Sequence, residues 1–314
     1  MGKIIVCSPS NVTGGPELLH QLVYELRKNN KDAYISYYPF NRNINTPSVY
    51  KKYLAPVTKL KDESDCFIII PESATWITKL IKNANIGIWW LSVDNYYRKT
   101  GDFAVKDKFN YFFGLITGQI VKIDQLKNYT HFAQSYYAYK FLSDHGIIPH
   151  FLGDKLSDTH LKDFSNFSIK KNIVAYNPKK GLRRTLKIIK ENPDLLFVPV
   201  VGNQTEVRNL LEISKVYIDF GHHPGKDRLP REAAMAGCCV ITNKRGSAFY
   251  KEDVPIPEKY KIDDFAIDYL QKTRNLILEI FENFNHCIKD FFLYKKIIIK
   301  EEILFSEQVK NIFC

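Results

Sequence analysis

Short apolar runs alternate with stretches of helical periodicity along most of this sequence, and that alternation restricts its fold more than any other feature. The run at residues 3–8 is followed by a helical stretch and then by the run at 33–38. The same order recurs with runs at 66–70, 86–92 and 131–134. An apolar run without polar alternation is typical of a parallel strand that helices cover on both faces. The pattern therefore predicts an α/β fold of βαβ units.

A second series of the same kind begins at residue 172. Its apolar runs lie at 173–176, 196–201, 216–220 and 239–242. The residues between about 150 and 170 are polar and lack periodicity, which predicts a linker. We therefore expect two Rossmann-like, doubly wound domains facing each other across a cleft, where the carboxyl ends of the strands bind ligands. The expected divisions are an acceptor-side domain at 1–155, a donor-binding domain at 170–290 and completing helices at 291–314.

The composition indicates a folded protein with excess positive charge. Hydrophobic residues make up 45% and charged residues 25% of the 314 positions, which excludes wholesale disorder. No apolar run approaches the ~20 residues that cross a bilayer, and the start shows no signal-peptide pattern, so we expect a cytoplasmic protein. The net charge of +11 suits nucleic acid, a membrane surface or a phosphate-bearing substrate. Composition alone does not choose among them.

Nothing in the sequence has the spacing of a metal site. The six cysteines form no CxxC or Cys/His pattern, and we expect them to be reduced structural thiols. His222 and His223 are adjacent, so their side chains point in different directions, and no third ligand is spaced nearby. We therefore expect no metal and no other cofactor.

The segment 216–242 carries the densest set of candidate ligand-binding residues. A strand leads into a loop, and a helix is predicted to begin at Pro230 and end at Gly237. Three cations are expected around its start: Lys226, Arg228 and Arg231. Together with the free N–H groups of the helix they would bind a diphosphate. Glu232, also placed in the first turn, suits the hydroxyl groups of a sugar. The alternative is a solvated basic loop before a helix.

This segment also carries a resemblance. The run Arg-Glu-Ala-Ala-Met-Ala-Gly-Cys-Cys-Val-Ile-Thr at 231–242 looks like the Glu-Ala-Met-Ala-x-Gly-x-Pro-Val-Val stretch of retaining, nucleotide-sugar-dependent glycosyltransferases of the GT-B fold. The resemblance implies that Glu232 holds the ribose of the donor. It also implies that the cations, Lys226 and Arg228 among them, stabilise the leaving diphosphate whether transfer retains or inverts configuration.

Two further motifs resemble the same family. Asn-Val-Thr-Gly-Gly-Pro-Glu at 11–17 resembles its N-terminal Gly-Gly loop, which implies that Gly14 and Gly15 line the cleft beside the donor phosphates. Asn-Pro-Lys-Lys-Gly at 177–181 lies where the family has a basic residue before Lys-Gly, which implies that Lys179 or Lys180 binds the diphosphate.

One position departs from the family. A first glutamate usually lies eight residues before the second and reaches the donor sugar, and here that position is Pro224. Asp227 or His223 is the candidate for the missing role. The departure leaves the donor sugar and the stereochemical outcome open, and it keeps open a catalytically inactive homologue with a scaffolding role.

Two carboxylates are candidate bases for an inverting transfer, which must remove the proton of the acceptor hydroxyl. Glu72 and Asp94 both follow predicted strands of the N-terminal half. We favour Asp94, because Trp90, Tyr96 and Tyr97 around it are expected to stack on a sugar acceptor. The alternatives are that Glu72 begins a helix and Asp94 caps a turn.

The expected function is therefore glycosyl transfer from a nucleotide-sugar donor to a hydroxyl of a glycan or lipid-linked glycan. By analogy we expect the setting to be bacterial surface-polysaccharide assembly (O-antigen, lipopolysaccharide or capsule). The basic-aromatic stretches 103–128 and 289–300 are candidates for peripheral contact with the inner membrane surface, or else ordinary core with a lysine rim. The alternative function is nucleic-acid binding, which the clustering of cations at loop–helix junctions does not favour.

Overall fold

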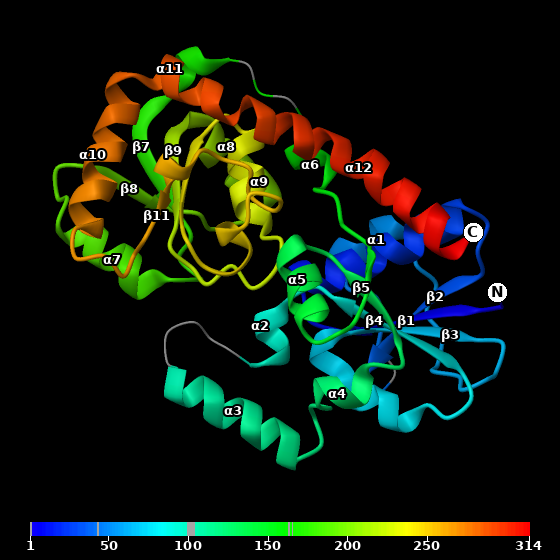
Figure 1. The fold of residues 1–314 in the computed structure, drawn as a ribbon. Coiled ribbons are helices and arrows are strands. Elements are labelled where there is room, and N and C mark those ends of the chain that lie inside the picture. The colour runs from blue at the N-terminus through cyan, green and yellow to red at the C-terminus, as the bar shows by residue number, and fades with distance from the viewer. Residues whose placement is uncertain (1, 43, 99–103, 163, 165) are drawn as a thin grey trace. The chain divides into compact units, whose positions relative to one another are not determined.

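The computed structural model describes residues 2–42, 44–98, 104–162, 164 and 166–314. These residues divide into two compact units (Figure 1). Unit 1 contains the described residues up to 98 together with 105–154 and 303–314, and unit 2 contains 155–302. Phe103, in the first basic-aromatic stretch, lies outside the described residues.

Unit 1 is built on a six-stranded parallel sheet with the order β2-β1-β3-β4-β5-β6. The strands are β1 (Ile4–Pro9), β2 (Ala33–Tyr38), β3 (Phe67–Pro71), β4 (Asn85–Trp90), β5 (Thr130–Ala133) and β6 (His150–Phe151). The helices are α1 (Gly14–Lys28), η1 (Ser48–Tyr53), η2 (Glu72–Leu80), α2 (Val93–Tyr96), α3 (Ala104–Ile116), α4 (Ile123–Leu126) and α5 (Tyr136–Asp144), of which η1 and η2 are 3₁₀.

Both faces of this sheet are buried, as the unbroken apolar runs predict. In β1, Ile4 and Val6 pack with α1 on one face, whereas Ile5 and Cys7 pack with the core that includes η2 and α5 on the other. Burial on both faces explains why the strand lacks the polar alternation of a half-exposed strand.

Unit 2 is built on a five-stranded parallel sheet with the order β11-β10-β9-β7-β8. The strands are β7 (Lys171–Tyr176), β8 (Leu196–Pro199), β9 (Ser214–Asp219), β10 (Cys239–Asn243) and β11 (Lys261–Ile262). The α-helices are α6 (Asp158–Leu161), α7 (Leu182–Lys190), α8 (Gln204–Ile213), α9 (Arg228–Met235), α10 (Tyr269–Glu282), α11 (Phe284–Cys287) and α12 (Phe292–Phe313). Short 3₁₀ turns are η3 (Phe167–Ile169), η4 (Gly246–Phe249), η5 (Glu258–Tyr260) and η6 (Ile288–Phe291).

The C-terminal segment is one long helix, α12, where the sequence predicts several. Its residues from 303 onward belong to unit 1, where Phe305, Val309 and Phe313 join the core that contains α1. Neither this helix nor any other in the described part of the chain combines the length and the apolarity that crossing a lipid bilayer requires.

The α/β class with two doubly wound sheets is confirmed, and most strands lie within a few residues of their predicted positions. The expected linker is more structured than its polar composition indicates, because it contains β6, α6 and η3. Helix α9 begins at Arg228, two residues before the predicted start, and ends before Gly237, whose φ is +76°. Arg231 and Glu232 therefore lie beyond its first turn.

Candidate functional site

In unit 2 the strand order reverses between β7 and β9, and the loops that follow these two strands lie next to each other. Such a switch point, at the carboxyl ends of parallel strands, is where ligands bind in doubly wound sheets. The loop after β7 contains Lys179 and Lys180, and the loop after β9 contains His223 and Asp227. The two loops that sequence analysis assigned to a diphosphate thus meet here.

Two glycines allow these loops to touch. Gly181 has a φ of +62°, and a Cβ there would lie 2.1 Å from the carbonyl oxygen of Phe220. A Cβ on Gly221 would lie 2.9 Å both from Asp219 Oδ1 and from Lys180 Cβ. A larger residue at either position would push the loops apart, which is the structural reason for a glycine directly after Lys180.

Asp219, the last residue of β9, ties the strand ends together. One carboxylate oxygen, Oδ2, accepts hydrogen bonds from Asn177 Nδ2 at 3.0 Å and from the Tyr217 hydroxyl at 2.9 Å. The other, Oδ1, accepts from the Gly221 N–H at 3.0 Å. Asp219 is 1% exposed, so its charge is held by protein donors rather than by water.

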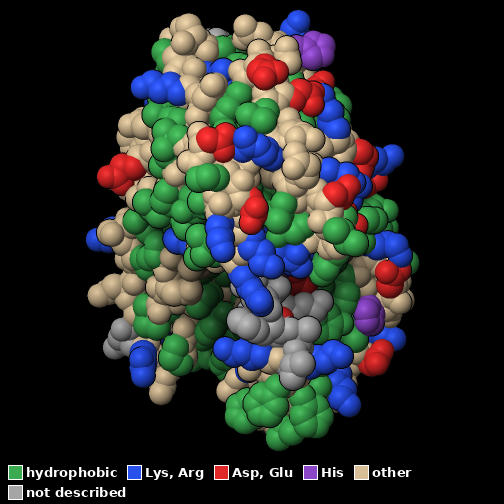
Figure 2. All heavy atoms as spheres, turned by 90° about the vertical axis from the view of Figure 1, so that its left-hand side faces the viewer, with side chains coloured by type: hydrophobic (Ala, Val, Ile, Leu, Met, Phe, Trp, Pro, Cys, Tyr) green, Lys and Arg blue, Asp and Glu red, His purple; other side chains and the backbone are tan. Residues whose placement is uncertain are grey.

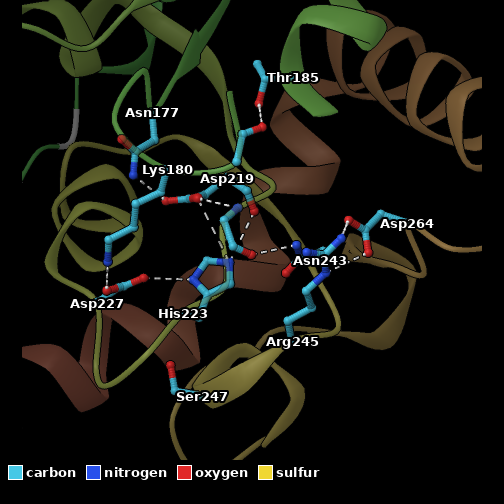
Figure 3. A network of polar contacts seen from close by, with 12 residues as sticks. Asn177, Lys180, Thr185, Asp219, His223, Asp227, Asn243, Arg245, Ser247 and Asp264 are labelled. Carbon is cyan, nitrogen blue, oxygen red and sulfur yellow. Dashed lines mark hydrogen bonds and ion pairs between the residues drawn. The ribbon is translucent and has the colours of Figure 1, made fainter. Parts of the chain in front are cut away.

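His223 and Asp227 extend this network toward Lys180 (Figure 3). The His223 ring nitrogen Nδ1 lies 2.9 Å from Asp227 Oδ2, and Lys180 Nζ donates to Asp227 Oδ1 at 2.6 Å. Burial disfavours the charged imidazole, but the carboxylates of Asp219 and Asp227 outweigh burial and raise the pKa of His223. Burial likewise opposes the charge of Asp227, yet Lys180 and His223 hold the pKa of that carboxyl well below its usual range.

The backbone of the 221–227 loop is held by the segment that follows β10. Asn243 Nδ2 donates to the Gly221 carbonyl at 2.6 Å, and Ser247 Oγ donates to the Gly225 carbonyl at 2.6 Å. The Ser247 N–H donates to the His223 carbonyl at 2.9 Å. His223 itself has a φ of +42°, a conformation that costs a non-glycine residue energy and persists only where its surroundings enforce it.

Two predicted phosphate-binding cations have a different role in the structure. The Arg231 side chain is fully buried, and its Nη1 donates to Glu301 Oε2 at 2.6 Å. Lys226 Nζ lies 2.7 Å from the other oxygen of Glu301. The prediction that Arg231 faces a diphosphate is therefore wrong for this structure. Lys226, 18% exposed at its side chain, is held in a salt bridge that the sequence did not indicate.

Arg228 and Glu232 lie one helical turn apart on α9. Arg228 Nε is 3.7 Å from Glu232 Oε1, and His160 Nε2 from α6 is 3.7 Å from the same oxygen. The Glu232 carboxylate is therefore held between two basic groups. The contact of Glu232 with the ribose of the donor stays a prediction.

A second basic cluster at this sheet edge escaped sequence analysis. Arg245, after β10, donates to the buried carboxylate of Asp264, after β11, at 3.1 Å. Arg184, in α7, lies 3.7 Å from the other oxygen of Asp264. Both guanidinium groups lie over the ring of Phe265, a side chain that is 72% exposed. These residues are scattered over 80 positions and form no motif, so only the fold reveals them.

In unit 1 the strand order reverses between β1 and β3, and the predicted Gly-Gly loop lies beside this switch point. Helix α1 begins at Gly14, so both glycines lie in its first turn. A Cβ on Gly15 would meet only Leu91 Cδ1 at 3.8 Å, which is an ordinary contact. Packing therefore does not require glycine at position 15.

Glu72 lies at the carboxyl end of β3 and is 2% exposed. Its Oε2 accepts from the Leu91 N–H at 2.9 Å, which ties the ends of β3 and β4 together. Burial raises the pKa of Glu72 to about 7. Asp94, in α2, is 4% exposed and accepts from the Tyr137 hydroxyl at 3.1 Å.

Two of the predicted acceptor-stacking residues lie in the core of unit 1. Trp90 is 0% exposed, and its indole N–H donates to His131 Nδ1 at 2.9 Å. Tyr96 is 1% exposed, and its hydroxyl donates to the Val121 carbonyl at 2.8 Å. The expectation that these two rings stack on a sugar is therefore wrong for this structure. Tyr97 is half-buried and packs on Tyr111.

Comparison with known proteins establishes the fold of this chain and nothing beyond it. No protein-family model matches the sequence, and no curated protein resembles it closely enough to match. Solved structures do match. Sucrose-phosphate synthase from Thermosynechococcus elongatus has a TM-score of 0.62 and 11% identity, covering 100% of this chain and 95% of that one.

Two other matches are of similar quality. The E. coli trehalose-6-phosphate structure bound with UDP-2-fluoro glucose has a TM-score of 0.59 and 10% identity, over 98% of this chain and 99% of that one. A glycosyltransferase from Rickettsia africae ESF-5 has a TM-score of 0.56 and 12% identity, over 99% and 94%. Likeness at such low identity establishes the architecture, and the chain has the GT-B fold that its sequence motifs led us to expect.

Proposed function

We propose that this protein is a glycosyltransferase that moves a sugar from a nucleotide-diphosphate donor to a hydroxyl of a glycan or lipid-linked glycan. The observation that carries the proposal is the contact between the loops after β7 and β9 at the switch point of unit 2. There Lys180 Nζ donates a hydrogen bond to Asp227 Oδ1 at 2.6 Å. The Lys180 side chain is 30% exposed, so a phosphate can reach its ammonium group. The GT-B fold and the UDP-sugar bound in the E. coli structure support this donor class.

The test is transfer together with donor binding. Sugar nucleotides are screened by thermal shift, and a radiolabelled or tagged sugar from the best binder is followed onto glycan acceptors. Glu232→Ala and Arg228→Ala should abolish transfer while the protein stays folded. Lys272→Ala, which removes a 60% exposed cation on α10, is the matched control and should keep full activity. Full activity in both α9 variants would refute the assignment.

The reaction is proposed to need no metal ion. Asp219, His223 and Asp227 lie close enough together to hold one. However, Asp219 already accepts three hydrogen bonds from protein groups, and Asp227 already binds Lys180 and His223. Lysine and arginine side chains of the protein would therefore neutralise the charge of the leaving diphosphate. Transfer should persist in the presence of a chelator.

Glu72 is the better supported of the two candidate bases. Because burial raises its pKa to about 7, it can exchange a proton near neutral pH. Its side chain is 2% exposed and accepts from the Leu91 N–H, so the loop after β4 would have to move for a substrate to reach that oxygen. Asp94 remains the alternative, held by Tyr137. An inactive Glu72→Gln variant with an active Asp94→Asn variant would assign the role.

Contact with an anionic membrane surface, at the cytoplasmic face, is part of the proposal because α3 exposes an apolar stripe. Phe109, Phe112, Phe113 and Ile116 are 68%, 61%, 51% and 69% exposed. They follow the spacing i, i+3, i+4, i+7 and so share one face of the helix. Figure 2 shows hydrophobic side chains gathered at the lower end of the view with Lys and Arg beside them, and Lys106 and Lys108 of α3 are exposed.

The opposite face of α3 packs on the rest of unit 1, so the apolar stripe faces solvent. A Cβ on Gly114 would lie 2.6 Å from Ile120 Cδ1, and Tyr111 packs on Tyr97 with ring centroids 5.0 Å apart. Apolar rings beside lysines are typical of a surface that binds anionic lipid. A lipid-linked glycan acceptor would lie at such a membrane surface. Bacterial surface-polysaccharide assembly is the setting that fits this kind of acceptor.

Vesicle flotation tests the membrane contact. The protein should float with vesicles that contain phosphatidylglycerol and stay in solution with phosphatidylcholine alone. Replacing Phe112 and Phe113 by Asp should abolish flotation, whereas Phe249→Asp, at a 60% exposed position of unit 2, should not. Flotation of the double variant, or no flotation of the wild type, would refute the contact. Self-association through α3 would appear as a larger mass in light scattering.

Nucleic-acid binding is not favoured. Lys180, Lys226 and Arg231, which carry part of the excess charge in unit 2, are paired with Asp227 and Glu301 rather than presented along one face.

A further inference from the structure

The two ring nitrogens of His223 both lie against hydrogen-bond acceptors. Nδ1 is 2.9 Å from the Asp227 carboxylate, and Nε2 is 3.2 Å from the backbone carbonyl oxygen of Asp219. A neutral imidazole has one N–H and one lone pair, so it would leave a lone pair against one of these oxygens. Both hydrogen bonds form only when both nitrogens donate, so this geometry favours the imidazolium form of His223.

The charges that face His223 come from each element packed against it. Asp219 from β9 has Oδ1 4.0 Å from Nε2, and Asp227 lies in the same loop as His223. Lys180 comes from the loop after β7 and reaches Asp227. The segment after β10 contributes the uncharged Asn243 and Ser247. Two carboxylates and two cations leave the cluster neutral, whereas a neutral imidazole would leave it with one negative charge.

Asp227 binds two basic side chains at once, and only one of them can also reach an incoming anion. Its Oδ2 faces His223 and its Oδ1 faces Lys180. His223 is 0% exposed and pinned at its carbonyl by Ser247, whereas the Lys180 side chain is 30% exposed. Of the two cations, Lys180 is the one that can turn away from Asp227 toward a ligand.

We propose that His223 is a positioning residue for the donor diphosphate: as an imidazolium it retains the Asp227 carboxylate, and thereby lets Lys180 leave Asp227 for a phosphate oxygen. This inference rests on the proposed donor site in unit 2. No covalent step is involved, because one ion pair replaces another. Without the imidazolium, Asp227 would keep its full attraction for Lys180 and would repel the phosphate.

The direction of the pH dependence follows. The carboxylates raise the pKa of His223 above that of an ordinary histidine, so the imidazolium is present below the raised value and lost as the pH rises through it. Binding of a diphosphate should weaken over that range. The diphosphate group of a nucleotide such as UDP also titrates, but it does so identically for every variant, so the ratio of two variants' affinities isolates His223.

The experiment measures the affinity of UDP and of inorganic pyrophosphate by calorimetry from pH 6 to pH 9. His223→Gln should bind about tenfold more weakly than wild type at low pH, with the ratio falling toward one as the pH rises. Asp227→Asn should bind more tightly than wild type, because Lys180 then has no competing carboxylate. A merely structural His223 predicts instead a ratio that does not vary with pH and an Asp227→Asn variant that binds more weakly, and either result overturns the inference.

Two controls separate this inference from the proposed function. Nitrogen-15 spectra of the imidazole, assigned by comparison with His223→Gln, should show both ring nitrogens protonated at neutral pH without any ligand, and a neutral ring there would refute the inference directly. If pyrophosphate binds with the expected pH dependence but UDP and sugar nucleotides do not, the His223 role stands and the nucleotide-donor function fails. If wild type binds neither probe, both fail.

Discussion

Arg231 donates a hydrogen bond to Glu301 at 2.6 Å although 70 positions separate them in the sequence. The same carboxylate receives Lys226 at 2.7 Å, so one residue of α12 neutralises two cations of the loop and helix that follow β9. Because Arg231 is 0% exposed and Glu301 4%, this is a buried ion pair that holds α9 and α12 together within unit 2. Cations that look like phosphate ligands in the sequence are here part of the scaffold.

Glu301→Gln should lower the free energy of unfolding by about 3–5 kcal/mol, because it leaves the charge of Arg231 buried without its counter-ion. Urea denaturation measures the loss. Glu302→Gln removes the neighbouring carboxylate, which is 51% exposed at its side chain and pairs with Lys155, and should cost about 1 kcal/mol or less. Equal losses in the two variants would contradict the assignment.

Lys170→Met should destabilise unit 2 by about 3 kcal/mol, since three buried carbonyl oxygens would each lose a hydrogen bond from a charged donor. Lys170 Nζ donates to the carbonyl oxygens of Leu211, Ser214 and Ala236 at 2.9, 2.8 and 2.8 Å, where α8 and α9 end. Thermal unfolding measures the effect. Lys171→Met, at the exposed next position, is the control and should change little. An unchanged melting temperature for Lys170→Met would show that these bonds contribute nothing.

Gly181→Ala should weaken UDP binding and cost more stability than Gly146→Ala. Both glycines have positive φ, +62° and +75°, so alanine is strained by about 1–2 kcal/mol at either position. Only at Gly181 would the added Cβ also meet backbone, 2.1 Å from the Phe220 oxygen, whereas nothing lies within 4 Å at Gly146. The difference between the two variants in urea denaturation and in calorimetry therefore isolates the contact between the two loops. Identical behaviour would argue against that contact.

Glu72→Gln should change how stability depends on pH. A carboxyl whose pKa is raised to about 7 in the folded state keeps its proton where the unfolded chain has lost it. Stability of the wild type should therefore fall between about pH 4.5 and pH 7 by up to ~1.4 kcal/mol per pH unit from this group, and level off above. The variant, which cannot titrate, should lack that decline. Urea denaturation at several pH values measures it, and parallel curves would exclude the raised pKa.

The order of the strands and helices was predictable because it rests on local patterns. Parallel strands buried on both faces leave unbroken apolar runs, so the strand at 33–38 coincides with its prediction. The short strands β6 and β11, of two residues each, carry too little pattern to be recognised. The start of α9 was misplaced because Pro230 suits the first helical position, yet proline is also tolerated two residues later, still within the first turn, where its missing N–H has no partner in the helix.

The candidate site was predictable only as far as its loops. The segment 216–242 was identified from its strand–loop–helix order, which places its loop at the carboxyl end of a strand, and residues 177–181 were identified from the family resemblance. What each side chain does there depends on partners that the sequence places far away. Glu301 takes up Arg231 and Lys226, Asp264 holds Arg184 and Arg245, and Trp90 and Tyr96 enter the core, all through contacts between segments distant in the chain.

The sequence by itself therefore determined the α/β architecture, the two sheets and the loops at their carboxyl ends, because periodicity and turn chemistry act within a few residues. The tertiary structure decided which charges are available to a ligand, since a charge is neutralised by whatever group folding brings within a few ångströms of it. Lys180 remains partly exposed, Arg231 is buried against Glu301, and the pKa of His223 is raised by two carboxylates that the loop geometry brings next to it.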